Sequence, residues 1–385
     1  MRFEFATAAH IVFGAGTVRE VAPAARQMGE RALLVAGLPP ERAATLMAGL
    51  KAAGVACSSL AVEAEPTLEL VRQGVRLARQ ERCDLVISIG GGSAIDAGTA
   101  IAALVSASGE PLDYLEVIGK GQSLMAPSVP FIAVPTTSGT GSEVTRNAVL
   151  ASPEHRVKAS LRSPFMLPRL AVVDPELTLG LPPAVTASTG LDALTQLIEP
   201  YVSIRANPMT GMFSVEGMRR AAGALLRACL NGRDLEARTD MALASLLGGL
   251  ALANAGLGAV HGFAAPLGGM FAAPHGAVCA ALLPHVMEVN IRALGARAPH
   301  SQPLGRYQTV ARILTGEPNA SAEDGFQWVS QICRQLQIPP LGSYGVRGQD
   351  IPALVELASQ TSSMKGNPIA LTPDELREIL TRALS

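Results

Sequence analysis

The N-terminal half of the chain alternates short β-branched strands with helical stretches, and this alternation limits the fold more than any other feature. Strand patterns occupy residues 32–37, 85–92 and 131–137, and residues 68–80 have helical periodicity. Strands separated by helices of this length form βαβ units, in which helices cover both faces of a parallel sheet. We therefore predict an α/β, Rossmann-like N-terminal domain.

The sequence pattern changes after about Val173, where a Pro- and Thr-rich segment leads into a C-terminal half with few strand patterns. No Asp, Glu, Lys or Arg occurs between Asp240 and Glu288, but polar residues and prolines interrupt the apolar runs. A membrane-spanning helix needs roughly 20 predominantly apolar residues in a row. We interpret this region as buried core helices and predict no membrane contact. The predicted domains are residues 1–180, which are α/β, and residues 181–385, which are all-helical.

Charge and cysteine content limit the class of function. The formal net charge is −1, from 31 basic and 32 acidic residues, so the chain lacks the strongly positive character of nucleic-acid-binding proteins. The N-terminus carries Arg2 and Glu4 and no apolar stretch, which argues against a secretory signal. Five scattered cysteines without a C-x-x-C pair fit reduced thiols. We predict a cytoplasmic protein that acts on a small molecule.

A glycine-rich turn ends the second strand pattern. Gly91, Gly92 and Ser93 lead from this strand into a helix. Glycines let the backbone approach a ligand closely, and the N–H groups of a helix N-terminus attract phosphate. The turn lacks the G-x-G-x-x-G pattern of Rossmann folds, so an ordinary strand-to-helix turn stays an alternative.

A second polar loop follows the third strand pattern. It contains Thr136, Thr137 and Thr140, whose hydroxyl groups suit a phosphate or a ribose. Two such loops after two parallel strands mark the carboxyl edge of a sheet, where open α/β folds bind ligands. We therefore predict that both loops contact a dinucleotide.

Four polar groups occur in apolar surroundings in the C-terminal half. Asp192 and Gln196 are four residues apart in a helical stretch and share one face, and His261 and His275 lie in the charge-free region. Each alone is compatible with a helix-stabilising pair or a core histidine. Together they are costly to bury without partners, and a divalent cation would balance the charge of Asp192.

Several motifs extend over nearly the whole chain. They are VFGAG at 12–16, GGGSAIDA at 90–97, PTTSGTGSEVT at 135–145, VDPELT at 173–178, GLDAL at 190–194, HGFAAPLGGMFAAPHG at 261–276 and SSMKGNP at 362–368. On these motifs the chain resembles the iron-containing (group III) alcohol dehydrogenases, within the wider superfamily that includes glycerol dehydrogenase and dehydroquinate synthase.

The resemblance implies a dehydroquinate synthase-like subunit, with NAD(P) bound by the N-terminal domain and a divalent metal and the substrate bound by the helical domain. The metal would be iron or zinc, and by motif position its ligands would be Asp192, Gln196, His261 and His275. The resemblance also implies a homo-oligomer, most simply a dimer, that acts on a small alcohol or aldehyde.

Further site residues follow from the same resemblance. Gly37 and Asp96 would belong to the cofactor site, and Lys158 matches a family lysine near the nicotinamide end of the cofactor. Lys158 and His275 are the residues that we expect to take part in catalysis.

The sequence departs from the family pattern at four positions. Gln196 stands where the family usually has a histidine, and its amide oxygen is a harder donor than imidazole, so we expect weaker or altered metal binding. Thr99 replaces a common lysine, and Ala265 replaces a histidine thought to relay a proton. Gly37 replaces an Asp that often binds the adenosine ribose. Without that carboxylate nothing repels the 2′-phosphate of NADP, so we expect NADP(H) to be tolerated.

We predict an NAD(P)-dependent oxidoreductase that transfers a hydride between an alcohol and its aldehyde or ketone, with a divalent metal that polarises the substrate oxygen. Two alternatives stay open. The loss of the histidine at Gln196 suggests a metal-independent reductase of a carboxylated keto substrate, similar to maleylacetate reductase, with Arg146 as a candidate carboxylate partner. Gln196, Ala265 and Thr99 together suggest a nucleotide-binding protein that has lost its chemistry.

Overall fold

The computed structural model describes residues 2–155 and 157–385 and divides them into two compact units. The α/β unit contains Ala6–Thr137 and Gly141–Thr178. The helical unit contains Leu179–Ser385 together with residues 2–5 and Ser138–Thr140. The predicted fold class, an α/β domain followed by a helical domain, is confirmed.

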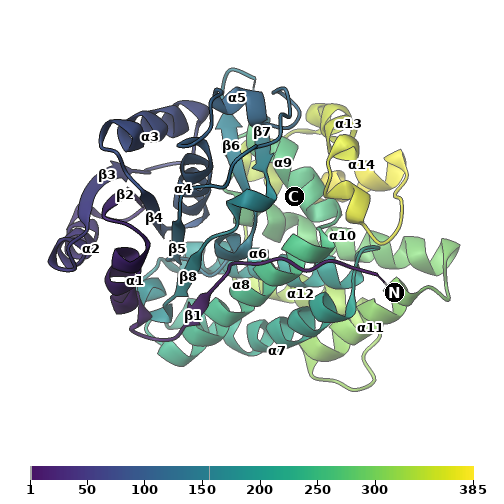
Figure 1. Cartoon of the computed structure of the whole chain (residues 1–385). Coiled ribbons are helices and arrows are strands. Elements are labelled where there is room, and N and C mark those ends of the chain that lie inside the picture. Colours follow the sequence, from purple (N-terminus) through teal and green to yellow (C-terminus); the bar gives the residue numbers. More distant parts are fainter. Residues whose placement is uncertain (1, 156) are drawn as a thin grey trace. The chain divides into compact units, whose positions relative to one another are not determined.

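The α/β unit is built on a parallel sheet of six strands (Figure 1). Their order across the sheet is β1-β8-β5-β4-β2-β3, and every pair within it is parallel. The three predicted strands are β2, β4 and β5. The strand bounds are β1 (Ile11–Phe13), β2 (Arg31–Ala36), β3 (Ala56–Ala61), β4 (Leu85–Gly90), β5 (Phe131–Pro135) and β8 (Leu170–Val173).

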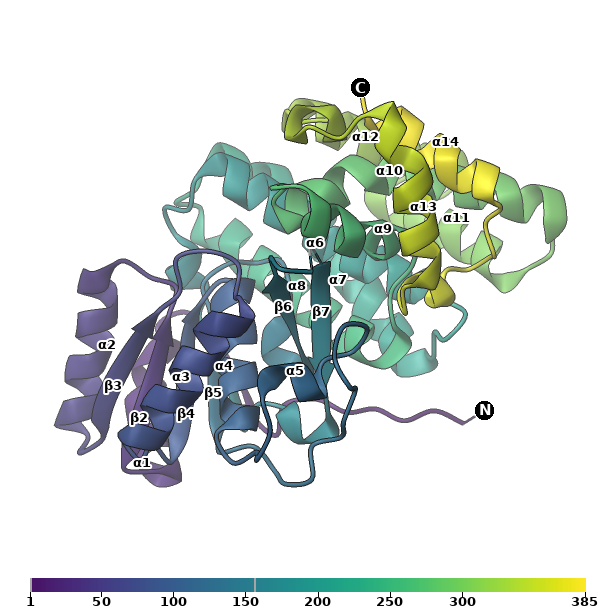
Figure 2. The ribbon, with the colours of Figure 1, turned by 90° about the horizontal axis from the view of Figure 1, so that it is seen from above.

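Helices cover both faces of this sheet because its strands are apolar on both sides (Figure 2). In β2, Leu33 and Val35 pack on one face with α3 (Leu68–Gln80) and α4 (Gly92–Leu104). Ala32, Leu34 and Ala36 pack on the opposite face with α1 (Val21–Met28) and α2 (Pro40–Ala52). This alternation is the period-two pattern of a strand buried on both faces.

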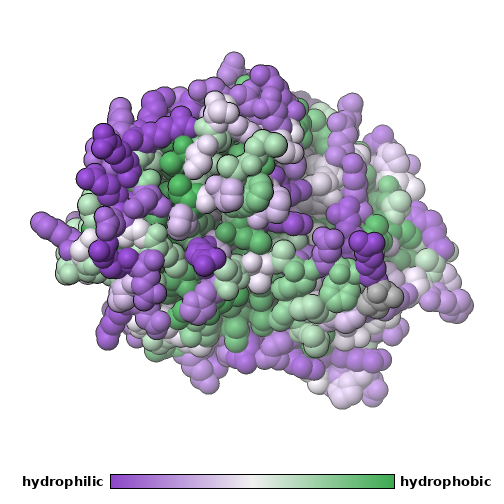
Figure 3. Space-filling model, in the orientation of Figure 1, coloured by the Kyte–Doolittle hydropathy of each residue, from purple (hydrophilic) through white to green (hydrophobic). Residues whose placement is uncertain are grey.

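Helix α3 is amphipathic, as its sequence predicts. Its residues Val71, Val75 and Ala78 are buried, whereas Arg72 and Arg76 form ion pairs with Glu69 on the outer surface. Figure 3 shows hydrophilic side chains gathered over the position of α3. The apolar stripe therefore fixes which side of this helix meets the sheet.

An antiparallel hairpin was not predicted from the sequence. Its strands are β6 (Asn147–Ser152) and β7 (Val157–Arg162), which pack against the same face as α4. The shorter elements of this unit are η1 (Thr17–Glu20), α5 (Pro111–Tyr114), η2 (Ser142–Val144), η3 (Pro164–Met166) and η4 (Pro175–Thr178).

The helical unit contains no strand after β8 in residues 174–385. Helix α6 packs on α7, α8 and α10, and α10 also contacts α9, α12 and α14. The long helices are α6 (Pro183–Val202), α7 (Pro208–Leu230), α8 (Leu235–Ala255), α9 (Ala259–Met270), α10 (His275–Arg297), α11 (Gln302–Thr315), α12 (Ala322–Gln335), α13 (Ile351–Gln360) and α14 (Pro373–Ala383). The short ones are η5 (Leu341–Tyr344), η6 (Gly348–Asp350) and η7 (Met364–Gly366).

The charge-free region forms α8, α9 and the first half of α10. By length and composition α10 would suffice to cross a membrane, but 83% of its apolar window is buried inside the protein. Helices α8 and α9 are bent by 97° at their junction. Helix α10 is therefore buried in the way that is typical of a core helix, as the sequence predicts.

Candidate active site

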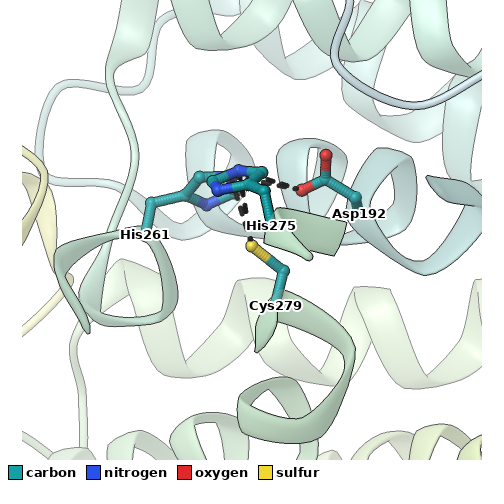
Figure 4. Close-up of side chains that lie close together, drawn as sticks. All are labelled: Asp192, His261, His275 and Cys279. Carbon is teal, nitrogen blue, oxygen red and sulfur yellow. Dashed lines mark hydrogen bonds and ion pairs between the residues drawn. The ribbon is translucent and has the colours of Figure 1, made fainter. Parts of the chain in front are cut away.

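Four ligand-type side chains converge in the helical unit (Figure 4). Asp192 comes from α6 and His261 from α9, while His275 and Cys279 come from the first turns of α10. Asp192 Oδ1 lies 3.4 Å from His261 Nε2 and 3.7 Å from His275 Nε2. Cys279 Sγ lies 3.8 Å and 3.7 Å from the same two nitrogens. We call these four residues the metal cluster.

Helix periodicity and one close helix contact bring these residues together. His275 and Cys279 are four residues apart and therefore share one face of α10. Helix α10 approaches α6 closely at Gly276, where a Cβ atom would lie only 2.7 Å from the backbone oxygen of Ser188. A residue larger than glycine at this position would push α10 away from Asp192.

Glu199 holds His261 in a fixed orientation. Its Oε2 lies 2.7 Å from His261 Nδ1, and its Oε1 accepts a 2.7 Å hydrogen bond from the N–H of Val260. Glu199 is buried, so these two bonds supply the partners that its carboxylate oxygens need. With the proton on Nδ1, the lone pair of Nε2 points toward Asp192 and Cys279. Carboxylate–histidine pairs of this kind commonly orient metal-binding imidazoles.

A buried amide network supports the N-terminus of α9 beside Glu199. The N–H of Ala259 donates to Asn367 Oδ1, and Asn367 exchanges hydrogen bonds with Asn290. Asn290 also donates to the hydroxyl of Tyr307. These contacts satisfy buried polar groups and hold the helix that carries His261.

The electrostatics of the metal cluster favour positive charge. Burial opposes the charge on His261, but the interactions with Cys279, Asp192 and Glu199 outweigh it, and the pKa of His261 lies well above 6.5. The interaction with Cys279 raises the pKa of His275 to about 9, with Asp192 adding to the effect against burial. Burial also opposes the charge on Asp192, yet the two imidazoles hold its pKa below the usual range.

The donor set fits a divalent cation. Asp192 is 1% exposed, and its Oδ1 accepts no hydrogen bond although it faces the cluster. A tetrahedral ion with bonds of roughly 2.0–2.3 Å holds its ligand atoms about 3.3–3.5 Å apart. Four of the six separations, from 3.4 to 3.8 Å, are close to this spacing, and all the ligand atoms lie within 4.8 Å of one another. A cation bound among these four groups would also contact Asp192 Oδ1, which makes no hydrogen bond.

Gln196 lies beside the metal cluster on the same face of α6. Its Nε2 donates a 3.0 Å hydrogen bond to Asp192 Oδ2, and its Oε1 is buried without a hydrogen-bond partner. The amide therefore contacts the carboxylate that Figure 4 places in the cluster. The role of Gln196 as a metal ligand stays a prediction.

The glycine-rich turn lies in the α/β unit where β4 passes into α4. Gly90 has φ of 157°, and a Cβ atom there would lie 2.6 Å from Ala94 Cβ and 2.9 Å from Gly37 Cα. Gly90 is thus required by the close approach of the two chain segments, whereas a Cβ atom at Gly37 would be tight, at 3.0 Å from Ala94 Cβ. Gly91 is the N-cap of α4, so the N–H groups of Gly92 and Ser93 belong to the unpaired first turn of a helix.

The sheet topology places this turn at a switch point. Strand β2 connects to β3 on one side, whereas β4 connects to β5 on the other, and β2 pairs directly with β4. Open α/β sheets bind ligands outside the carboxyl ends of the strands at such a point. Gly37 follows β2 and Gly91 follows β4, so both lie at this crevice.

Asp96 and Lys158, predicted from the family resemblance, already have partners within the α/β unit. Asp96 Oδ2 accepts a 3.1 Å hydrogen bond from the N–H of Val149, which ties α4 to β6. Lys158 Nζ lies 3.0 Å from Glu65 Oε1, and the lysine side chain is 8% exposed. Asp96 thus helps to hold α4 against β6, and both its place in the cofactor site and the catalytic role of Lys158 stay predictions.

The predicted threonines divide between the two units. Thr136 and Thr137 follow β5 in the α/β unit, with Thr136 buried. Thr140 belongs to the segment Ser138–Thr140, which groups with the helical unit; its neighbour Gly139 is in contact with Thr189 of α6. Thr99, at the position of the family lysine, is buried and donates to the backbone oxygen of Ile95.

Comparison with known proteins decides the family. Residues 8–175 match the family model described as iron-containing alcohol dehydrogenase, and residues 186–384 match the model of its C-terminal domain. The chain belongs to the iron-containing alcohol dehydrogenase family. The resemblance drawn from the motifs is thereby confirmed, and so is the assignment of the chain as an oxidoreductase of this family.

Individual relatives align with most of this chain. Alcohol dehydrogenase 4 of Schizosaccharomyces pombe is 40% identical over 324 residues, which cover 84% of this chain and 74% of that protein. The NAD-dependent methanol dehydrogenase of Bacillus methanolicus is 35% identical over 384 residues, with 97% of each chain covered. The crystal structure of a 1,3-propanediol oxidoreductase superposes with a TM-score of 0.92 at 33% identity and covers 100% of both chains.

Two residues of the site, Cys279 and Glu199, were not predicted from the sequence. Cys279 lies four residues after His275, and Glu199 lies seven residues after Asp192, so each shares a helix face with a predicted ligand. Extending the i, i+4 and i, i+7 search from every predicted ligand would have found both.

Proposed function

We propose that the chain is an NAD(P)-dependent alcohol dehydrogenase that transfers a hydride from the carbon of a small alcohol to the nicotinamide and releases the hydroxyl proton. The observation that carries this proposal is the metal cluster in a member of this family, in which the buried Asp192 Oδ1 makes no hydrogen bond and faces two imidazoles. A divalent cation held there supplies a Lewis acid for the substrate oxygen, while NAD(P) supplies the hydride acceptor.

At the metal cluster the protein contributes charge and orientation. Asp192 supplies the carboxylate, and His261 and His275 supply imidazole nitrogens that face it. Glu199 orients His261 through Nδ1, and with the proton on Nδ1 the Nε2 atom would be available to bind a metal. The side chain of His275 is 36% exposed, whereas Asp192 is buried, so substrate would approach from the side of His275.

At the switch point the protein contributes backbone donors. The first-turn N–H groups at Gly92 and Ser93 and the positive end of α4 suit a pyrophosphate. We assign Gly37, Gly91, Thr136 and Thr137 to the surroundings of this dinucleotide, with Asp96 holding α4 against β6. The NAD-dependent relative of Bacillus methanolicus, matched over 97% of this chain, supports the cofactor class.

NADP(H) is expected to serve as well as NAD(H) to within about tenfold in kcat/KM. Gly37 offers no carboxylate to repel the 2′-phosphate, and a tenfold difference corresponds to only about 1.4 kcal/mol. Steady-state kinetics with both oxidised cofactors and one saturating alcohol measure this ratio. A preference for NAD+ of a thousandfold would show that another group performs the discrimination.

Metal affinity is expected to rise with pH from 6.5 to at least about 9. In the metal-free protein the pKa of His275 is about 9, above its ordinary 6.5, so at pH 7 this imidazole carries a proton that a metal must displace. Each pH unit below about 9 then weakens binding by up to about tenfold per displaced proton. Competition titrations with a chelator from pH 6.5 to 9.5 measure this slope, and a Kd independent of pH would contradict it.

Substrate profiling separates this function from a metal-independent reductase of carboxylated ketones. Initial rates with simple alcohols and aldehydes, and with keto acids, are measured before and after removal of metal by a chelator. We expect turnover of simple alcohols that disappears with the metal. Turnover restricted to keto acids and insensitive to chelator would instead support the reductase and a role for Arg146, while binding of NAD(P)H without any turnover would support a non-catalytic protein.

We also propose a cytoplasmic location and a homodimer. The five cysteines are free thiols, which fits a reducing compartment. Strand β1 is an edge strand of the sheet and exposes one side to pairing. Sedimentation analysis of the purified chain measures the oligomeric state.

A further inference from the structure

The fourth side chain of the metal cluster does not come from position 196, where the family usually has a histidine. The family pattern expects a histidine at position 196, where this chain has Gln196. Instead, Cys279 reaches the cluster from α10, one helical turn after His275. Cys279 is fully buried, and its sulfur faces the same two Nε2 atoms that face Asp192.

Gln196 and Cys279 have different contacts, and these contacts suggest different roles. The amide nitrogen of Gln196 is already bonded to Asp192 Oδ2, so this side chain fixes the carboxylate with its other oxygen, Oδ1, toward the histidines. Cys279 Sγ is 3.8 Å and 3.7 Å from those histidines, close to the separation of about 3.5 Å between a sulfur and a nitrogen on one tetrahedral ion. Asp192 Oδ1 is buried, makes no hydrogen bond and faces both imidazoles, so a cation bound between them would contact it as well.

We infer that Cys279, as a thiolate, is the fourth metal ligand beside Asp192, His261 and His275, and that Gln196 is a positioning residue for Asp192. This inference rests on the proposed function, because it assumes that the cluster binds a divalent cation. The donor set then contains two nitrogens, one oxygen and one sulfur. Its two negative charges neutralise a divalent ion. Without them the ion would be costly to bury.

The sulfur ligand also changes which metal the site selects. Soft thiolate donors favour zinc, whereas the carbonyl-type oxygen of a coordinating Gln196 would favour harder ions such as magnesium or manganese. A site with Cys279 as ligand is therefore a zinc site within a family named for iron. Replacing the sulfur is expected to lower the ratio of zinc to magnesium affinity.

Cobalt(II) is the probe that distinguishes a sulfur ligand directly. The metal-free full-length protein is titrated with Co(II), and a thiolate on the ion produces a sulfur-to-cobalt charge-transfer band in the near ultraviolet. We expect this band in the wild-type protein and in Cys229→Ser, which removes another buried cysteine of the same helical unit outside the cluster. Cys279→Ala should lose the band and bind cobalt at least about 10-fold more weakly, since loss of even an outer-sphere partner costs 10- to 100-fold.

The possible results separate this inference from the proposed function. Cobalt bound tightly without a charge-transfer band, and with the same Kd in Cys279→Ala, would overturn Cys279 as a ligand while leaving a metal-dependent enzyme intact. No cobalt binding by the wild-type protein would overturn both.

A double variant tests whether position 196 can replace the sulfur. In Cys279→Ala, the added substitution Gln196→His places an imidazole on the face of α6 that carries Asp192. We expect the double variant to recover at least about 10-fold in cobalt affinity over Cys279→Ala, without the charge-transfer band. Recovery of the band would mean that a sulfur other than Cys279 produces it, and unchanged affinity would mean that position 196 does not face the ion.

Discussion

Replacing Asp192 with Asn is expected to lower kcat/KM for alcohol oxidation by at least about a thousandfold. Asp192 is the only carboxylate of the metal cluster, and the amide keeps its size but removes its charge. Loss of a Lewis acid removes several kcal/mol of transition-state stabilisation, and each 1.36 kcal/mol is about tenfold in rate. Metal content and kcat/KM, measured on the same preparation, should fall together.

The matched control is Asp240→Asn in the same helical unit. Asp240 pairs with Arg220 at a partly exposed position away from the cluster, so this variant should keep its metal and nearly all of its activity. Thermal melts of both variants establish that they fold. Asp192→Asn with normal kcat/KM and no bound metal would contradict the proposed role of the carboxylate.

Replacing Glu199 with Gln is expected to weaken metal binding by about 10- to 100-fold, the range for an outer-sphere partner of a metal-binding histidine. Gln has one acceptor oxygen where Glu199 uses two, toward Val260 N–H and His261 Nδ1. If the oxygen of the new amide keeps accepting from the N–H of Val260, the amide nitrogen faces His261 Nδ1. The His261 proton then moves to Nε2, the atom that should bind the metal.

The opposite orientation of the new amide is also unfavourable. It leaves the buried N–H of Val260 without an acceptor, at a cost of about 1–3 kcal/mol. Glu288→Gln is the control, because Glu288 lies on α10 and pairs with Arg382 outside the cluster. Chelator competition gives Kd for both variants. If Glu199→Gln and Glu288→Gln bind metal equally well, the Glu199 contact does not set the tautomer of His261.

Much of the fold could be predicted because its signals are local. The helix predicted at residues 68–80 coincides with α3, and the predicted strands end one or two residues beyond β2, β4 and β5. These overruns occur where the turn chemistry begins, at Gly37, Gly91 and Thr136. The hairpin β6–β7 escaped prediction because its alternation reflects packing on α4, which is a long-range contact.

The candidate site was predictable only in part, for the same reason. Asp192, His261 and His275 follow from motifs, but their convergence depends on how α6, α9 and α10 cross. The spacing of Cys279 puts it on one helix face with His275, but its approach to His261 depends on how α10 packs against α9. Glu199 likewise gained its role only when the N-terminus of α9 packed against it.

The central claim is that this alcohol dehydrogenase works through a metal held by the cluster of Asp192, His261, His275 and Cys279. The most direct test removes metal from the wild-type enzyme stepwise with a chelator and measures metal content by elemental analysis and kcat with an alcohol on the same samples. We predict that activity falls in proportion to metal, reaches zero with it, and returns when zinc is restored. Full activity in protein that contains negligible metal would contradict the claim.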